Sequence, residues 1–82
     1  MDIREKFDEI IMENVESSFD DLVEKVKTML ESTCNSGHIL SYNYYIDMDV
    51  YDSSGLDIYY LSIAWVDTEN KVHVAGASYW NC

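Results

Sequence analysis

The chain has 82 residues, 48% of them hydrophobic, and sixteen Asp and Glu residues against five Lys and Arg give a formal net charge of −11. The hydrophobic content exceeds that of disordered segments, so we expect the chain to fold. Because such an acidic surface repels phosphate groups, the charge argues against direct binding of nucleic acid or anionic membranes and favours a basic protein as partner.

The length favours one domain covering residues 1–82, in which about 60 to 65% of the surface of the unfolded chain is buried on folding. The N-terminal segment is charged from its second residue. No apolar run approaches the roughly 18 residues of a membrane span. We therefore expect a soluble, cytoplasmic protein.

The cysteines and histidines offer weak evidence for chemistry. Cys34 and His38 lie four residues apart, and His73 and Cys82 would complete a quartet of metal ligands. Zinc sites usually show tighter, repeated pairs of ligands, and two residues of each type arise readily by chance in a short chain. The chain also lacks a glycine-rich phosphate loop, a nucleophile elbow and an HExxH motif. We expect no metal, no cofactor, no Cys–His nucleophile and no enzymatic activity.

The first third of the chain has the pattern of helix. Residues 2–33 contain neither Gly nor Pro, and apolar residues recur at helical spacing. If each residue advances about 100° around the helix axis, the apolar residues from Phe19 onward face a direction about a quarter turn away from that of the apolar residues before Phe19. Ser17 or Ser18 would cap a new helix, with an Asp three residues later completing a capping box. We predict a kink or interruption near Ser17, with one long helix as the alternative.

Acidic residues form a ridge along the polar side of this helical region. They follow one another at steps of three or four residues: Glu5, Glu9, Glu13, Glu16, Asp20 and Glu24. Like charges four residues apart destabilise an isolated helix by about 0.2 to 0.5 kcal/mol per pair. For the ridge taken alone, the solvated face of an acidic protein is the simpler interpretation. A break near Ser17 would also bend it.

After Gly37 the hydrophobic period changes to two, which predicts strands. The segment "DSSG", residues 52–55, is typical of a four-residue hairpin turn. Pairing Tyr51 with Leu56 sets apolar or aromatic residues opposite one another on one face, as Tyr42–Trp65, Tyr44–Ile63, Ile46–Leu61 and Met48–Tyr59. The patterns of the two strands therefore agree on one register.

A second turn in "DTENK" predicts a third strand, with Val66 opposite Lys71. In that register the residues facing the helices would be Val72, Val74, Gly76 and Ser78. The terminal "ASYWNC" would extend this strand or fold across an end. The expected fold is α+β, with a helix or kinked helix pair (about 2–33) on one face of a three-stranded antiparallel meander (about 38–80), in the order α-β-β-β.

The opposite sheet face would be rich in Tyr and Asp. It would also carry His73, Ala75, Ala77 and Tyr79 from the third strand. Tyrosine supplies rigid contact area, and aspartates two apart on a strand project about 6.6 Å from one another, a coarse copy of a phosphate row. Residues 28–70 contain neither Lys nor Arg, although a generic soluble surface mixes both signs. Solubility and protection of a sheet edge are the alternative explanation.

The pattern favours a small acidic inhibitor that occupies the basic, nucleic-acid-binding surface of a target protein. The candidate contact residues are Tyr45, Asp47, Asp49, Tyr51, Asp57 and Tyr60 on the sheet, and Glu5, Glu9, Glu13, Glu16 and Asp20 on the helices. In size, charge and expected architecture the chain resembles small acidic αβ proteins of phage origin that block host defence nucleases, including anti-CRISPR proteins. This resemblance implies a nuclease or nucleic-acid-binding defence complex as target, and the bacterial cytosol as location. It rests on no family motif, so it transfers no functional residues.

Two other functions fit the same pattern. An immunity protein that neutralises a nuclease toxin would use the same electrostatics. A homodimeric structural or regulatory module would instead pair exposed strands or self-associate through the tyrosine face.

Overall fold

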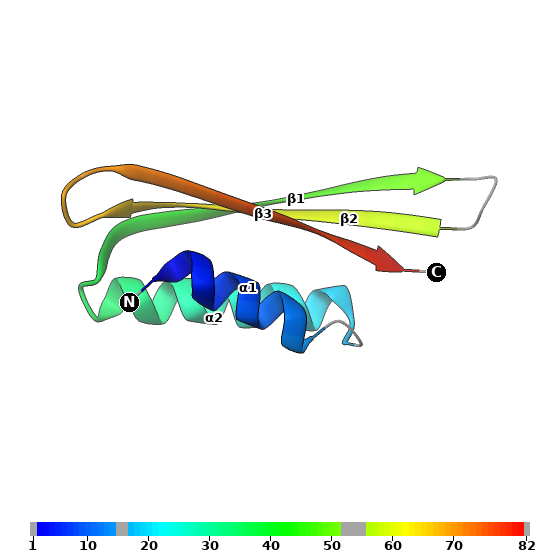
Figure 1. Ribbon diagram of the computed structural model, residues 1–82, viewed down its shortest axis with the longest axis horizontal. Helices are drawn as coiled ribbons and strands as arrows, with labels where there is room; N and C mark the ends of the chain where they lie inside the picture. Colours follow the sequence, from blue (N-terminus) through cyan, green and yellow to red (C-terminus); the bar gives the residue numbers. More distant parts are fainter. Residues whose placement is uncertain (1, 15–16, 52–55, 82) are drawn as a thin grey trace.

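The computed structural model describes residues 2–14, 17–51 and 56–81, and the side chains of residues 2–14, 17–48 and 58–79. Its elements are α1 (Ile3–Glu13), α2 (Phe19–Asn35), β1 (Ile39–Tyr51), β2 (Leu56–Asp67) and β3 (Val72–Asn81). The expected α+β architecture is confirmed. Two helices pack on one face of an antiparallel sheet of order β1-β2-β3 (Figure 1).

The predicted interruption near Ser17 is confirmed, and the single long helix is wrong. Asp2 caps α1 by accepting a hydrogen bond from the N–H of Arg4 at 3.0 Å, and Ser18 caps α2 by accepting from the N–H of Asp21 at 3.3 Å. Between the helices, the buried Asn14 accepts a hydrogen bond from the ammonium of Lys25. The two helices therefore lie side by side and run in opposite directions (Figure 1).

Gly37 ends α2 as expected from its position. Its φ of 82° lies in the left-handed region that favours glycine. The N–H of Gly37 donates to the carbonyl of Cys34 at 3.0 Å, and the N–H of His38 donates to that of Thr33 at 3.1 Å. This pair of bonds is the Schellman arrangement, which satisfies the last carbonyls of the helix and turns the chain into β1.

The core lies between the helices and one face of the sheet, called the inner face below. Phe7 of α1 and Leu30 of α2 are fully buried against Leu61 and Ile63 of β2. Burying a side chain of this size contributes about 1.5 to 3 kcal/mol. The central strand therefore supplies the core on the sheet side.

The register predicted for β1 and β2 is confirmed. The observed partners are Tyr42–Trp65, Tyr44–Ile63, Ile46–Leu61, Met48–Tyr59 and Tyr51–Leu56. The turn expected over residues 52–55 lies outside the described residues.

The register predicted for β3 is wrong by one residue, because Val66 pairs with Val72 rather than with Lys71. Asn70 adopts a φ of 67°, and its N–H donates to the carbonyl of Asp67 at 3.0 Å. The N–H of Asp67 in turn donates to the carbonyl of Lys71 at 2.9 Å. This is a three-residue hairpin loop with one left-handed residue, instead of the expected four-residue turn.

A shift of one residue exchanges the two faces of a strand. The residues of β3 opposite inner-face positions of β2 are therefore His73, Ala75, Ala77 and Tyr79, which were expected outside. Val72, Val74, Gly76 and Ser78 were expected inside and lie on the other face. The small Ala75 and Ala77 leave the space for helix side chains that Gly76 and Ser78 were expected to provide.

The sheet extends beyond the helices at the end where β1 leads into β2 (Figure 1). The 13 residues of β1 span about 43 Å at 3.3 Å each, against about 26 Å for the 17 residues of α2. Ile46 and Met48, on the inner face of β1, are consequently 50% and 48% exposed. The sequence pattern assigned their face correctly but overestimated their burial.

An aromatic cluster closes the core near this end. Phe19, the first residue of α2, stacks on Tyr59 with ring centroids 4.6 Å apart and lies 5.8 Å from Tyr79. The hydroxyl of Tyr79 donates to the carbonyl of Ser17. The cluster ties the loop between the helices to β2 and β3.

Within the described segments, no helix is both long enough and apolar enough to cross a bilayer.

The left-handed conformation of Asn70 makes the β2–β3 loop testable. Asn70→Ala should lower the free energy of unfolding by about 1 to 2 kcal/mol, because residues other than Gly, Asn and Asp pay a steric cost in this region. Asn70→Gly should stay close to the wild type. Urea unfolding followed by circular dichroism measures both, with Thr68→Ala in the same exposed loop as control. Equal losses for Asn70→Ala and Asn70→Gly would contradict the loop conformation.

Candidate functional site

The sheet face opposite the helices, called the outer face, is built from cross-strand rows of three residues. The rows with described side chains are Ser41–Val66–Val72, Asn43–Ala64–Val74, Tyr45–Ser62–Gly76 and Asp47–Tyr60–Ser78. Tyr45, Val72 and Val74 are 60%, 70% and 64% exposed. No strand contains Lys or Arg. The described part of the outer face therefore combines exposed apolar side chains with the exposed carboxylate of Asp47.

Tyr45 is held in place by its neighbour on the same face. The side-chain amide of Asn43 donates to the hydroxyl of Tyr45 at 3.1 Å, while its Oδ1 accepts from the N–H of Tyr44 at 2.9 Å. Because both ends of the amide are engaged, the ring is oriented before any partner arrives. A preoriented aromatic ring loses less conformational entropy on binding than a mobile one.

The predicted sheet residues do not all share this face. Tyr45 and Asp47 are exposed there, and Tyr60 is half-buried in the row of Asp47. Asp49 and Tyr51 follow in the same alternation along β1, opposite Ile58 and Leu56. Asp57 pairs with Val50 and Asn81. Along β2 it alternates with the inner-face set that includes Tyr59, and not with the outer-face set that includes Tyr60. The side chains of Asp49, Tyr51 and Asp57 lie outside the described part.

The outer face is also less uniformly solvated than the sequence indicated. Ile58, in the alternation of Tyr60, is only 4% exposed. Among the described side chains of the outer face, the exposed ones lie in the four rows nearer the β2–β3 loop.

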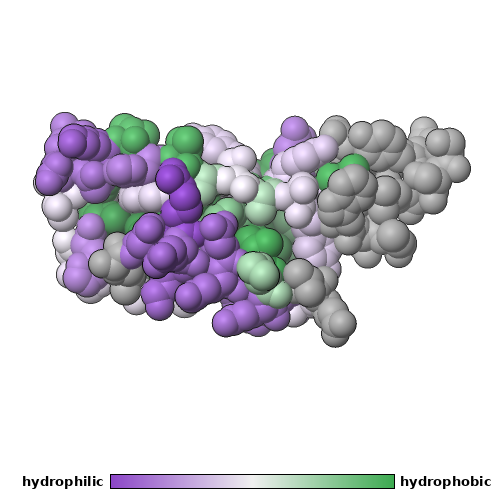
Figure 2. All heavy atoms as spheres, in the orientation of Figure 1, coloured by the Kyte–Doolittle hydropathy of each residue, from purple (hydrophilic) through white to green (hydrophobic). Residues whose placement is uncertain are grey.

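The acidic ridge predicted along one helix is divided. Glu5, Glu9 and Glu13 are exposed on α1, whereas Asp20 is exposed in the first turn of α2. The chain reverses between them, and Glu16 lies outside the described residues. Figure 2 shows hydrophilic residues gathered over the helical layer, while hydrophobic residues reach the surface along the sheet. The helical carboxylates and the outer face therefore lie on opposite sides of the domain.

Both free edges of the sheet carry side chains bonded to their backbone. On β1, the carboxylate of Asp47 accepts from the N–H of Met48 at 2.9 Å, and Asn43 similarly bonds the N–H of Tyr44. On β3, the guanidinium of Arg4 donates to the carbonyl of Val74 at 2.8 Å. Side chains that bond edge groups oppose the addition of a further strand. Asp47 thus has a structural role in addition to its exposure.

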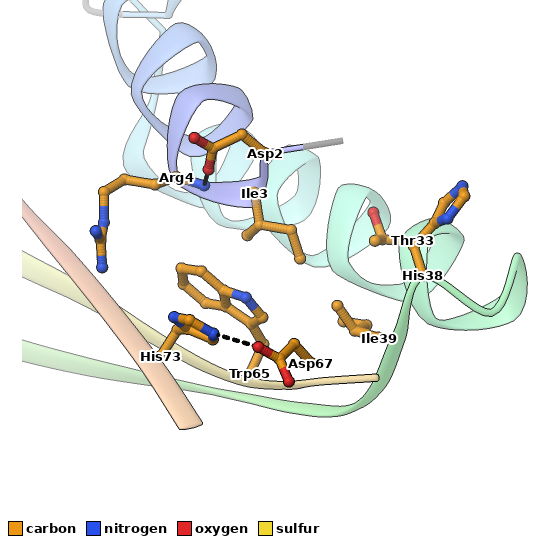
Figure 3. A pocket seen from close by; sticks show the side chains of 9 residues that line it. All are labelled: Asp2, Ile3, Arg4, Thr33, His38, Ile39, Trp65, Asp67 and His73. Atoms are coloured by element: carbon orange, nitrogen blue, oxygen red, sulfur yellow. Dashed lines mark hydrogen bonds and ion pairs between the residues drawn. The ribbon is translucent and has the colours of Figure 1, made fainter. Parts of the chain in front are cut away.

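A pocket of about 600 Å³ opens between the start of α1, the end of α2 and the β2–β3 loop (Figure 3). It is lined by Asp2, Ile3, Arg4, Thr33, His38, Ile39, Trp65, Asp67 and His73. The imidazole of His73 stacks on Trp65 with ring centroids 5.4 Å apart, and the guanidinium of Arg4 lies 5.9 Å from the centroid of Trp65. The only arginine and both histidines of this acidic chain therefore line one pocket.

Asp67 connects the pocket with the β2–β3 loop. Its Oδ2 lies 2.7 Å from Nε2 of His73, and its Oδ1 accepts from the N–H groups of Glu69 at 2.8 Å and Lys71 at 3.0 Å. The bond with His73, followed by that from Lys71, holds the pKa of Asp67 below its ordinary value of 3.8. Ionised Asp67 therefore stabilises both the loop and the position of His73.

A hydroxyl that lines the pocket and the thiol that follows it in the chain both contact backbone carbonyl oxygens. The hydroxyl of Thr33 donates to the carbonyl of Met29 at 2.7 Å. The thiol of Cys34 lies 3.7 Å from the carbonyl oxygen of Leu40. No group of three His, Cys, Asp or Glu side chains converges as metal ligands among the described residues. The pocket lies where the start of α1, the end of α2 and the β2–β3 loop meet.

The sequence analysis did not predict the contact of His73 with Trp65 and Asp67, because the register that it assigned to β3 placed His73 on the opposite face of the sheet. One signal was present. "DTENK" carries Asn70 two residues before the third strand begins, and Asn tolerates the left-handed conformation that a three-residue loop requires. Reading that Asn as the left-handed residue would have set His73 opposite Trp65.

Comparison with known proteins does not assign a family: no family model, curated protein or solved structure matches the chain.

The bonds of Asp67 predict a pH dependence of stability. Its folded pKa is lowered, so its contribution is present above the unfolded value near 3.8 and is lost as the pH falls through the lower folded value. Asp67→Asn should therefore melt below the wild type at neutral pH, and the difference should shrink once the pH drops below the unfolded value near 3.8. Thermal melts across this range test it, with Glu69→Gln as control. A constant difference in melting temperature would contradict this role of Asp67.

Proposed function

We propose that this protein is an acidic inhibitor that binds the basic, nucleic-acid-binding surface of a target protein through the outer face. The observation that carries the proposal is the composition of that face. Exposed Tyr45, Val72 and Val74 share the outer face with the exposed carboxylate of Asp47, on strands without any Lys or Arg. Protein interfaces combine an apolar, aromatic-rich centre with a polar rim.

The corrected register of β3 supports a contact surface. The sequence placed His73, Ala75, Ala77 and Tyr79 outside, whereas Val72, Val74, Gly76 and Ser78 occupy the outer face in their place. Two exposed valines on one strand add apolar area at about 25 cal/mol per Å² when a partner covers them. The outer face therefore gains two exposed valines, while Tyr79 lies against Phe19 on the inner side.

The helical carboxylates support the proposal in a different way. Glu5, Glu9 and Glu13 lie on the opposite side of the domain from Asp47. Charges separated by more than the Debye length, about 8 Å at physiological salt, are largely screened from one another. One partner docked on the outer face would thus feel them mainly during approach, as part of a net charge of −11 that speeds association with a basic surface.

An immunity protein for a nuclease toxin remains the alternative within the same physics, because the same anionic surface would fit either target. The identity of the partner distinguishes the two.

A self-associating module is favoured by one observation, the exposure of Val72 and Val74, which a second copy would cover. Size-exclusion chromatography with light scattering measures this: a stable dimer without partner supports the module.

A matched pair of charge variants tests which surface makes contact. Asp47→Asn should slow association with a partner purified from the host by about 1.5- to 5-fold, the range for one exposed ion pair of about 0.2 to 1 kcal/mol. Glu31→Gln removes the same charge from an exposed site on α2 and should leave the rate within error. Surface plasmon resonance at several salt concentrations measures both. A larger effect of Glu9→Lys with Glu13→Lys would move the contact to the helices.

Competition with nucleic acid tests the inhibitory mechanism. DNA or RNA that binds the purified partner should be displaced by this protein, and added salt should weaken the complex because ion pairs hold it. Fluorescence anisotropy of labelled nucleic acid measures the displacement. A partner that binds no nucleic acid, or a ternary complex without displacement, would overturn the proposal.

A further inference from the structure

The carboxylate of Asp47 carries a charge that its bond to the backbone does not require. Its Oδ1 accepts a hydrogen bond from the N–H of the following residue, Met48, at 2.9 Å. Four residues earlier on β1, the Oδ1 of Asn43 accepts from the N–H of Tyr44 at the same distance of 2.9 Å. A neutral amide therefore provides the same bond to the edge of the strand, and the negative charge of Asp47 is additional to it.

No basic side chain pairs with Asp47 among the described residues. Both ion pairs found in this part of the chain lie at the β2–β3 loop and the start of β3. The only arginine, Arg4, donates to the carbonyl of Val74 on β3, at the opposite edge of the sheet from β1. The three lysines outside the loop belong to the helices, which cover the other face. The carboxylate of Asp47 is thus available to a cation from outside the chain.

Tyr45 presents an aromatic ring next to this carboxylate. It lies two residues before Asp47 on β1, so the two side chains project from the outer face about 6.6 Å apart. Tyr45 is 60% exposed, whereas Tyr60, opposite Asp47 on β2, is half-buried. Asn43 bonds the hydroxyl of Tyr45 at 3.1 Å from the side away from Asp47, which leaves the carboxylate unblocked. One exposed ring with a fixed orientation therefore adjoins one exposed carboxylate.

An arginine side chain matches this pair of groups. Its planar guanidinium stacks on aromatic rings at up to about 6 Å from the ring centroid, and it donates several N–H groups to a carboxylate at about 2.7 to 2.9 Å. A separation of about 6.6 Å between the two residues lets one guanidinium contact both. The ammonium of lysine is a compact, strongly hydrated charge that does not stack in this way. The ring and the carboxylate together therefore favour arginine over lysine.

Two other occupants fit less well. A second copy of the chain brings no Lys or Arg on its strands, and its only arginine is bonded to Val74 and lies 5.9 Å from the ring centroid of Trp65. A metal ion needs several converging ligands, and no group of three His, Cys, Asp or Glu side chains gathers in the described part of the chain. Neither supplies a planar cation that contacts the ring and the carboxylate together.

We propose that Tyr45 and Asp47 form a binding site for an arginine side chain on the basic surface of the target protein. The guanidinium stacks on the ring of Tyr45 and donates to the carboxylate of Asp47, whose Oδ2 is not used by the bond from Met48. The inference rests on the proposed function, since it names the side chain of the target that the outer face recognises. Tyr45 and Asp47 are then the residues that determine the specificity of this contact.

Single amino-acid derivatives test the site without the target. The probes are the N-acetyl amides of arginine, lysine and citrulline, titrated into the isotope-labelled full-length chain at low salt. Nuclear magnetic resonance should show saturable shifts of the amides of Tyr45 and Asp47 with the arginine compound. Affinity for the lysine compound should be about two- to fivefold lower, the contribution of one exposed cation–π contact. Citrulline keeps the planar group but lacks the charge, so it should cause no saturable shifts there.

Two substitutions separate the contributions of charge and ring. Asp47→Asn keeps an oxygen for the N–H of Met48, as Asn43 shows, and should weaken binding of the arginine compound about 1.5- to 5-fold. Tyr45→Leu keeps an apolar side chain at this exposed position and should remove the preference for arginine over lysine. Glu31→Gln, an equal loss of charge on α2, is the control and should change neither. Thermal melts verify that each variant folds.

The possible failures are distinct. Shifts centred on the glutamates of α1, equal affinity for the arginine and lysine compounds, or unchanged binding by Asp47→Asn would each overturn the arginine site. So would the absence of saturable binding at Tyr45 and Asp47. None of these results affects displacement of nucleic acid from the host partner, which tests the proposed function separately. Conversely, a host partner that binds no nucleic acid would overturn that function even if Tyr45 and Asp47 bound arginine.

Discussion

The backbone conformation of one residue in the β2–β3 loop decides which surface this protein presents. Asn70 takes a left-handed conformation, and the resulting three-residue loop pairs Val66 with Val72. A loop longer by one residue would exchange the two faces of β3. With the observed register, His73 reaches Trp65 and Asp67, and the valines of β3 face outward. Internal packing at one end of the core and the apolar outer face therefore have a common cause.

The Asp67–His73 pair shows how this loop is joined to the core. Asp67 binds two backbone N–H groups of the loop through one oxygen and the imidazole of His73 through the other. The imidazole in turn stacks on Trp65, which packs with the buried residues of both helices. The carboxylate of Asp67, the last residue of β2, thereby holds the loop through charge-assisted hydrogen bonds. The helices cover only the inner face of this sheet. A rigid support of this kind suits a surface that binds without rearrangement.

Acidic residues of this protein have at least two different roles. Asp67 is engaged in internal bonds, Asp47 is exposed but also bonds the backbone of an edge strand, and the glutamates of α1 face solvent. The net charge therefore overstates the number of carboxylates that a partner could contact on any one surface of the protein. Contact energy on the outer face comes mainly from apolar area, and the summed charge contributes orientation and rate of approach. This division is consistent with an inhibitor of a basic surface that does not copy nucleic acid phosphate by phosphate.

Local pattern was sufficient for the order of elements, the break near Ser17, the end of α2 at Gly37 and the register of β1 with β2. Each depends on capping, on glycine or on two alternating strands that constrain one another within a short segment. The register of β3 was not determined in this way. His73, Ala75 and Ala77 alternate with Val72, Val74 and Gly76, so either set could face the core by hydropathy.

The tertiary structure resolved that choice. Aromatic stacking of His73 on Trp65, the bond with Asp67 and the space that Ala75 and Ala77 leave beneath the helices all require one face inward. The reversal of α1 against α2 likewise divided an acidic ridge that was continuous only in sequence. The sequence by itself thus determined the elements and the charge of this protein. Which side chains share a surface was decided only by packing, because contacts between distant segments outweigh local pattern where that pattern permits two answers.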